Sequence, residues 1–216
     1  MPLPSLPEPF DPTCRRCPRL VNHLDHIREQ HPAYHCAPVA AWGSLRARLL
    51  VVGLAPGLHG ANRTGRPFSG DASGVTLFES LAAAGFAMFT PRGVVLRNCR
   101  ITNAVRCLPP GNRPLTSEVE NCGPYLADDL ERLRGTRPRC VVTLGALAFK
   151  ATAAAFGARG TFAHGLELDV LGNVRSPLRS NVTLLAAYHP SRLNINTGRL
   201  TQSMLDAVFR RAAEIV

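Results

Sequence analysis

Arg48-Leu-Leu-Val-Val-Gly-Leu54 is a short apolar run that leads directly into Ala55-Pro56-Gly57. A run of this length that stops at proline and glycine predicts a buried strand followed by a loop. Three further runs of the same character lie at residues 100–105, 139–144 and 182–188. Helical patterns occupy residues 74–84, 117–133, 146–156 and 200–215, between these strands and after the last one.

Strands that alternate with helices predict an α/β fold, a three-layer sandwich with a central, mostly parallel four-stranded sheet flanked by helices. Ligands of such folds bind outside the carboxyl ends of the strands. Loops 53–57, 103–112 and 189–194 each follow a predicted strand, so we expect them to converge on one crevice. Residues 160–181 alternate Gly, Pro and short apolar runs, which predicts a hairpin-like insertion.

Length and composition indicate one globular domain over residues 13–216. The 216 residues are 45% hydrophobic, and no apolar run approaches the length of a membrane span. Residues 1–12 contain five prolines and lack the basic and apolar regions of a signal peptide. We therefore expect a flexible N-terminal arm on a cytoplasmic, monomeric protein.

The net charge of +10 comes from arginine, since Lys150 is the only lysine. Arginine forms bidentate contacts with phosphate, so the charge favours a polyanionic partner such as DNA. The alternative is an arginine-rich genome that places Arg instead of Lys on solvated faces.

The seven cysteines, an odd number, argue against a disulfide framework. Cys14 and Cys17 form a Cys-x-x-Cys pair, while Cys107 and Cys122 bracket a Pro-rich stretch. Four thiolates are enough for one iron–sulfur cluster or one zinc ion, and this pattern alone does not name the metal. Such a centre would fasten the N-terminal segment to a loop of the main domain. The other three cysteines are Cys36, Cys99 and Cys140, of which Cys140 is expected in the core.

The loop 53–74 holds six glycines, two arginines and a single acid, Asp71. Its backbone can approach a ligand closely, although it matches neither a P-loop nor a dinucleotide fingerprint. Phe68 precedes Asp71 by three residues, so an aromatic face can stack on a base while a carboxylate acts on the adjacent sugar or water. The alternative is structural: Phe68 anchors the core and Asp71 caps a helix.

A second polar segment, Tyr188-His-Pro-Ser-Arg-Leu-Asn194, follows the last strand. His189, held by the proline after it, is placed to hydrogen-bond developing negative charge. Ser191 and Arg192 suit phosphate contacts, and Leu193 suits an apolar wedge that fills the gap left by an extruded base. The remaining histidines lack such a context and are expected at the surface or in packing: His23, His26, His31, His35, His59 and His164.

These segments together resemble a known family. Gly53-Leu-Ala-Pro-Gly57 with Asn62-Arg-Thr-Gly-Arg-Pro-Phe-Ser-Gly-Asp-Ala-Ser-Gly74 resembles the first motif of the family-five (type B) uracil-DNA glycosylases. His189-Pro-Ser-Arg-Leu-Asn194 with Thr197-Gly-Arg-Leu-Thr201 resembles their last motif. The cysteine pattern, including Val105-Arg-Cys-Leu-Pro-Pro-Gly-Asn-Arg-Pro114, resembles that of families four and five. Family four has a carboxylate in Gly-Glu-Ala-Pro-Gly, where this chain has Leu54 and Ala55.

The resemblance implies a DNA repair enzyme that flips out uracil, and with it hypoxanthine, and hydrolyses the N-glycosidic bond to leave an abasic site. It implies a [4Fe–4S] cluster on Cys14, Cys17, Cys107 and Cys122. Asp71 would stabilise the sugar cation or orient water, His189 would hydrogen-bond the leaving base, and Asn112 would complete the catalytic set. Substrate-binding positions would be Gly53, Ala55, Gly57, Phe68 and Asn103; DNA-binding positions would be Arg63, Arg66, Arg113, Ser191, Arg192 and Leu193.

Three alternatives stay open on the sequence. A non-catalytic, zinc-stapled DNA-binding module would explain the charge and the cysteines. A family-four-like enzyme would be narrowly specific for uracil. A cluster protein of the same fold would crosslink covalently to its abasic product.

Overall fold

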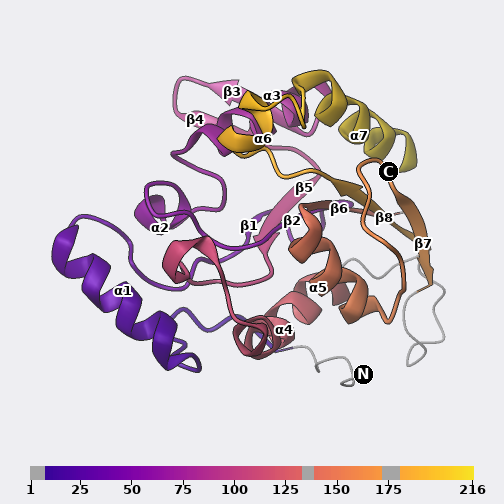
Figure 1. Ribbon diagram of the computed structural model, residues 1–216. Coiled ribbons are helices and arrows are strands. Elements are labelled where there is room, and N and C mark those ends of the chain that lie inside the picture. The colour runs from indigo at the N-terminus through magenta and orange to yellow at the C-terminus, as the bar shows by residue number, and fades with distance from the viewer. Residues whose placement is uncertain (1–7, 133–138, 172–180) are drawn as a thin grey trace.

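The computed structural model describes residues 8–132, 139–171 and 181–216, and it is organised around a six-stranded sheet of order β1-β5-β2-β6-β8-β7 (Figure 1). Its parallel centre consists of the four predicted strands: β2 (Leu49–Gly53), β5 (Cys99–Asn103), β6 (Arg139–Leu144) and β8 (Asn181–Ala187). Val51 of β2 stands opposite Ile101 and Val142 of its two neighbours. The predicted α/β fold with a mostly parallel sheet is thus confirmed.

Two antiparallel edge strands extend the sheet beyond the four predicted strands. β1 (Trp42–Gly43) pairs with β5, and β7 (Glu167–Leu171) pairs with β8. β7 lies within the predicted hairpin-like insertion and forms an antiparallel pair with the strand that follows it. Residues 172–180 of that insertion lie outside the described part of the chain.

Helices cover both faces of the sheet. Helices α3 (Ala72–Ala83) and α7 (Gln202–Ile215) pack on one face, and α4 (Thr116–Glu131) and α5 (Ala146–Phe156) pack on the other (Figure 1). Successive strand residues point to opposite faces, so Val51 belongs to the first core while Leu50 and Val52 belong to the second. In the described residues, no helix is long and apolar enough to cross a membrane.

Helix α1 (Pro18–Gln30) was not predicted. It begins directly after Cys17, with Pro18 in its first turn, where proline costs no hydrogen bond. Leu20, Leu24 and Ile27 share one face and form a third core cluster with the segment around Cys107. In Figure 1 this helix lies at the left, apart from the sheet.

Three short helical elements and one hairpin connect the larger elements in the described residues. They are α2 (Ala61–Thr64), the 3₁₀ turn η1 (Pro110–Asn112), α6 (Arg192–Asn196) and a separate two-stranded hairpin, β3 (Ala87–Thr90) with β4 (Gly93–Leu96). Of the predicted N-terminal arm, residues 1–7 lie outside the described residues. Beyond them, the Glu8 amide donates to the Pro124 carbonyl over 3.1 Å and Phe10 packs edge-on against Tyr125, so this end of the arm is attached to α4.

Candidate active site and cysteine-lined cavity

The loops after β2, β5 and β8 converge on one cavity of about 710 Å³, as their positions at strand ends predict. The start of α3, the η1 turn and the start of α6 complete its wall. Nine of the residues predicted from the sequence line it: Ala55, Gly57, Phe68, Asp71, Asn103, Asn112, His189, Ser191 and Arg192.

Asp71 is held in the wall by its place at the start of α3. It is the N-cap residue, and its Oδ1 accepts a hydrogen bond of 2.9 Å from the Gly74 amide. This capping role is the structural alternative considered for Asp71, and it coexists with a position in the cavity. The other oxygen, Oδ2, lies against the turn 57–60, where a Cβ at Gly60 would collide with it. Glycine at this position leaves room for the carboxylate.

Replacing Gly60 with alanine should therefore displace the Asp71 carboxylate. We expect the rate of the base excision that the family resemblance implies to fall about 100-fold, since a shift of about 1 Å at a reacting group has effects of this size. The measurement is single-turnover excision beside a thermal melt. Gly57→Ala is the graded control, because its Cβ would stand at an ordinary 3.4 Å from the same oxygen. Equal losses in the two variants would contradict this account of Gly60.

Phe68 is nearly buried, belongs to the core cluster between α3 and the sheet, and has a left-handed backbone with φ of 56°. Its ring centroid lies 6.0 Å from that of His189, with the two planes 31° apart. Gly53 does not line the cavity. A Cβ there would lie 2.7 Å from the Phe68 ring and collide with Asn103, so Gly53 gives these two side chains their space. Asn103 is buried at the end of β5 with its side chain in the cavity wall.

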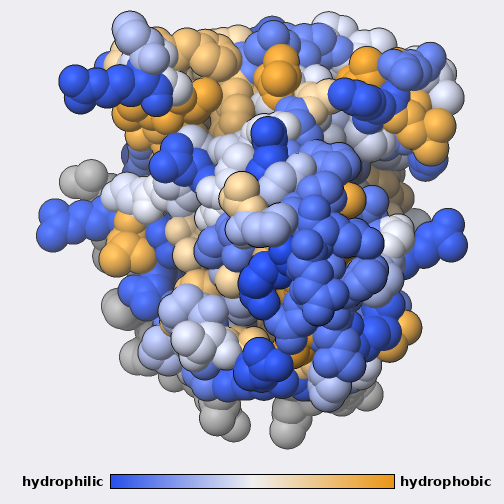
Figure 2. Space-filling view, turned by 90° about the vertical axis from the view of Figure 1, so that its left-hand side faces the viewer, coloured by the Kyte–Doolittle hydropathy of each residue, from blue (hydrophilic) through white to orange (hydrophobic). Residues whose placement is uncertain are grey.

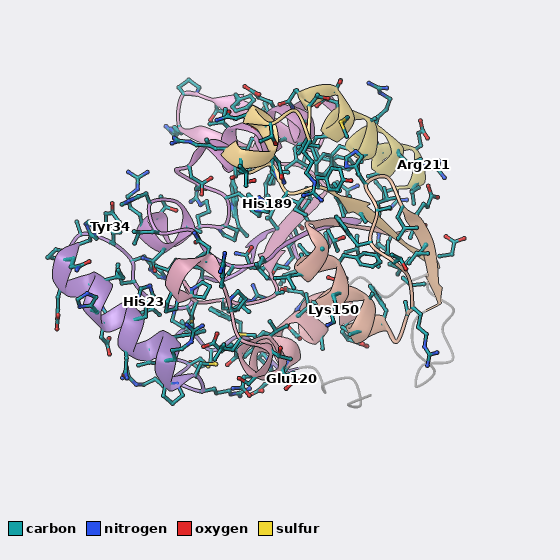
Figure 3. The ribbon with its side chains drawn as sticks, viewed as in Figure 1. His23, Tyr34, Glu120, Lys150, His189 and Arg211 are labelled. Carbon is teal, nitrogen blue, oxygen red and sulfur yellow. The ribbon has the colours of Figure 1, made fainter. Side chains whose placement is uncertain are left out.

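His189 follows the last central strand and is fixed through its backbone. Its carbonyl accepts hydrogen bonds of 2.8 Å from the Asn194 side-chain amide and from the Ser191 amide. Figure 3 shows the residue near the middle of the molecule, below α6. Burial lowers the pKa of His189 below its usual value, and the Asp71 carboxylate offsets part of that shift. The imidazole is therefore neutral at neutral pH and can donate a hydrogen bond without carrying charge.

This lowered pKa predicts how His189 affects stability. An unfolded histidine titrates near pH 6.5, so from about pH 7.5 to about pH 5.5 the unfolded chain takes up a proton that the folded chain takes up less readily. The free energy of unfolding should fall on acidification. Because the pKa values of His23 and His164 are also lowered, the test compares urea midpoints of the wild type and His189→Gln. The variant should lose less stability than the wild type; parallel losses would contradict the shift.

The residues predicted to contact DNA are distributed around the cavity. Arg192 and Ser191 line it, and Leu193 beside them is 72% exposed. Arg66 is exposed, with its guanidinium 4.7 Å from the centre of the Trp42 ring. Arg113 is exposed after the η1 turn. Arg63 donates to the carbonyls of His59 and Gly70, so it braces the glycine-rich loop from within.

His59, expected from the sequence at the surface or in packing, belongs to the cavity wall. Its Nδ1 lies 3.0 Å from the Tyr34 hydroxyl. Figure 3 shows Tyr34 on the side of the molecule occupied by α1. The available signal was the position of His59 two residues after Gly57 in the glycine-rich loop; its pairing with Tyr34 has no local signal.

The four predicted metal ligands line a second, smaller cavity between α1 and α4. Cys14, Cys17, Cys107 and Cys122 all contribute to its wall, and none forms a disulfide. Burial raises the pKa of Cys107 to about 12 and that of Cys122 to about 11, so a metal would have to displace their protons. In the described part of the chain, no three His, Cys, Asp or Glu side chains are arranged to hold a single metal ion. As a donor set, four thiols around one cavity fit an iron–sulfur cluster.

Ion pairs brace the elements that carry these cysteines. The nearly fully buried Arg106, which precedes Cys107, pairs with Asp129 of α4. On the α1 side, Arg19 makes a bidentate contact of 2.8 and 2.9 Å with Glu118 and donates to the Arg113 carbonyl over 3.0 Å. The Pro-rich loop between Cys107 and Cys122 is thus tied to both helices.

Comparison with known proteins agrees with this geometry. A family model described as the uracil DNA glycosylase superfamily matches residues 40–213. A type-5 uracil-DNA glycosylase of Pyrobaculum aerophilum is 45% identical over 210 residues, covering 93% of this chain and 88% of that protein. A type-5 enzyme of Thermus thermophilus is 39% identical and covers 94% and 93%, whereas a type-4 uracil-DNA glycosylase of P. aerophilum is 34% identical and covers 73% and 74%. The predicted resemblance is confirmed: the chain belongs to the uracil DNA glycosylase superfamily, in its type-5 branch.

Proposed function

We propose that this chain excises uracil from DNA as a repair glycosylase, and that it also excises hypoxanthine. The observation that carries the proposal is the meeting of Asp71, His189, Phe68 and Asn103 in one cavity of about 710 Å³ at the carboxyl ends of the parallel strands. A base inside duplex DNA is out of reach of such a cavity. The target nucleotide therefore has to be extruded from the stack before reaction.

On the sugar side, Asp71 is the group that responds to the developing charge. Breaking the bond between C1′ and the base nitrogen leaves positive charge on the deoxyribose, as in other glycoside hydrolyses. A carboxylate stabilises that cation and orients the water whose oxygen bonds to C1′. Its position is fixed by the hydrogen bond from the Gly74 amide, so little reorganisation is needed during the reaction.

On the base side, the electron pair of the broken bond leaves with the base, which becomes an anion until it is protonated. A neutral His189 donates a hydrogen bond to this anion. The nearby Phe68 ring stacks against the base, and the buried Asn103 amide reads its edge. Asn112, in the wall on the η1 turn, helps to position the water or the sugar.

A broad substrate range follows from what lines the base pocket. Leu54 and Ala55 occupy the wall where a carboxylate of a family-four motif would stand. A pocket with few obligatory polar contacts rejects analogues weakly, because a wrong base leaves few buried polar groups unpaired. Hypoxanthine should thus be accepted with uracil.

The direct test is multiple-turnover excision from oligonucleotides that carry one uracil or one hypoxanthine. Release of both bases, with product abasic sites free of covalently attached protein, supports the full proposal. Release of uracil alone would indicate narrow specificity. A protein–DNA adduct that persists after one turnover would instead indicate the crosslinking alternative, and binding without any release would indicate a DNA-binding module.

We further propose that Cys14, Cys17, Cys107 and Cys122 hold a [4Fe–4S] cluster with a structural role. In a cluster each thiolate binds a different iron, whereas the four ligands of zinc meet about 2.3 Å from one centre. Four thiols around one cavity are the donor set that such a cluster needs, and the family resemblance favours the cluster over zinc. When bound, it would crosslink the N-terminal segment to the loop that carries Asn112.

A further inference from the structure

A second groove, of about 650 Å³, adjoins the candidate active site. The two share the wall formed by Phe68, Gly70, Asp71, Ala72 and Arg192, so the groove opens beside the mouth of the cavity. We call it the flank groove. Its other residues come from β1, from α3, from the β3–β4 hairpin and from the glycine-rich loop, including Trp42, Val75, Phe89 and Arg66.

The flank groove is rimmed by large apolar side chains that face solvent. Phe89 is 57% exposed and Val75 is 59% exposed, and Val94 stands opposite Phe89 in the hairpin and lines the groove with it. The elements at the top of Figure 1 also form the top of Figure 2, where apolar residues gather between long hydrophilic side chains. Apolar patches of this kind on soluble proteins mark binding surfaces.

Cations accompany these apolar groups. Arg66 lies over the Trp42 ring, and Arg192 stands at the boundary between cavity and groove. Neither arginine forms an ion pair with a carboxylate in the part of the chain that the structure describes. Glu79 is the one acid that the groove adds to the Asp71 it shares with the cavity. Aromatic faces interleaved with arginines are the pattern that binds single-stranded nucleic acid.

We propose that the flank groove binds a nucleotide adjacent to the extruded one in the substrate strand. Its base leaves the stack of its neighbours and packs on the Phe89 ring, and its phosphate contacts Arg66 and Arg192. The groove adjoins the cavity, so the part of a DNA substrate closest to it is the strand on either side of the extruded nucleotide. That strand carries the phosphates that the two arginines can bind. This inference rests on the proposed glycosylase function, and it adds a binding site outside the base pocket.

The test varies the DNA on each side of a single-stranded uracil nucleotide that carries a 2′-fluoro group, which blocks cleavage. Oligonucleotides with no flank, with a 5′ flank, with a 3′ flank or with both are titrated against each protein by fluorescence anisotropy. For the wild type, one of the two flanks should strengthen binding. Phe89→Ser should weaken binding of oligonucleotides with that flank about tenfold, the scale of one base–aromatic stack, and leave the others unchanged.

Two further variants make the result decisive. Leu45→Ser is the matched control, since Leu45 is 55% exposed in the turn before β2, away from the strand ends that carry the site. Phe89→Trp retains an aromatic face and should bind as the wild type does. Equal behaviour of Phe89→Ser and Leu45→Ser on every oligonucleotide would overturn the proposal. Excision of uracil from an unmodified long strand by the wild type tests the proposed function separately, so the two failures are distinguishable.

Discussion

Asp71→Asn should lower the rate of uracil excision by about 10² to 10⁴-fold, the range expected when a general base or charge-stabilising carboxylate is removed. The amide has the shape of the carboxylate but lacks the negative charge that stabilises a sugar cation. Single-turnover excision under saturating enzyme measures the chemical step without product release.

The asparagine variant separates chemistry from folding because Asp71 also caps α3. Asparagine caps helices as well as aspartate does, so the hydrogen bond from the Gly74 amide is preserved. We therefore expect the thermal midpoint, and the affinity for DNA with a non-cleavable uracil nucleotide, to stay close to those of the wild type. Excision at a near-normal rate would remove Asp71 from the proposed mechanism. A loss of DNA affinity equal to the loss of rate would indicate a binding role only.

The sequence predicts the centre of the fold well because buried parallel strands are continuous apolar runs between helices. Leu49–Gly53 and Asn181–Ala187 are of this kind. The elements missed have weaker patterns. β1 has two residues, one of them a glycine, and it exists because β5 offers an open edge. Helix α1 carries many polar residues, so its apolar stripe of Leu20, Leu24 and Ile27 is a weak helical signal in the sequence.

The sequence predicts where the candidate site lies, at the carboxyl ends of the strands, but not the contacts that hold its side chains. Residues directly after parallel strands meet at one sheet edge, which is why Asn103 and His189 share a cavity with the glycine-rich loop. The structural alternatives are found, since Phe68 lies in the core and Asp71 caps α3, and both residues also line the cavity; their roles in the reaction stay predictions. The dependence of Asp71 on Gly60, and the pairing of His59 with Tyr34, are tertiary contacts that no local pattern reports.

Replacing Cys107 with alanine should remove the brown colour of the purified protein and strongly lower its stability. The proposed cluster joins Cys14 and Cys17 to Cys107 and Cys122, so it closes a loop of roughly 90 residues. By analogy with a disulfide, such a crosslink contributes about 4 kcal/mol to the free energy of unfolding. Urea denaturation, visible absorption, and iron and sulfide content per chain measure the effect. Cys140→Ala is the matched control, since Cys140 is fully buried in the sheet, outside the cysteine-lined cavity.

Activity should fall together with the cluster, because its four ligands hold the loop that bears Asn112. That loop is also fastened to α1 by Arg19, which pairs with Glu118 and donates to the Arg113 carbonyl. Without the crosslink, the apolar face of α1 still packs in the third core cluster. We therefore expect a loosened loop and not a fully unfolded chain. The excision rate should then fall strongly, while the thermal midpoint of the sheet should change less. A colourless wild-type protein with one zinc per chain would contradict the cluster, although the four cysteines would still form a metal crosslink. Full activity of Cys107→Ala would contradict the proposed dependence of the active site on the metal crosslink.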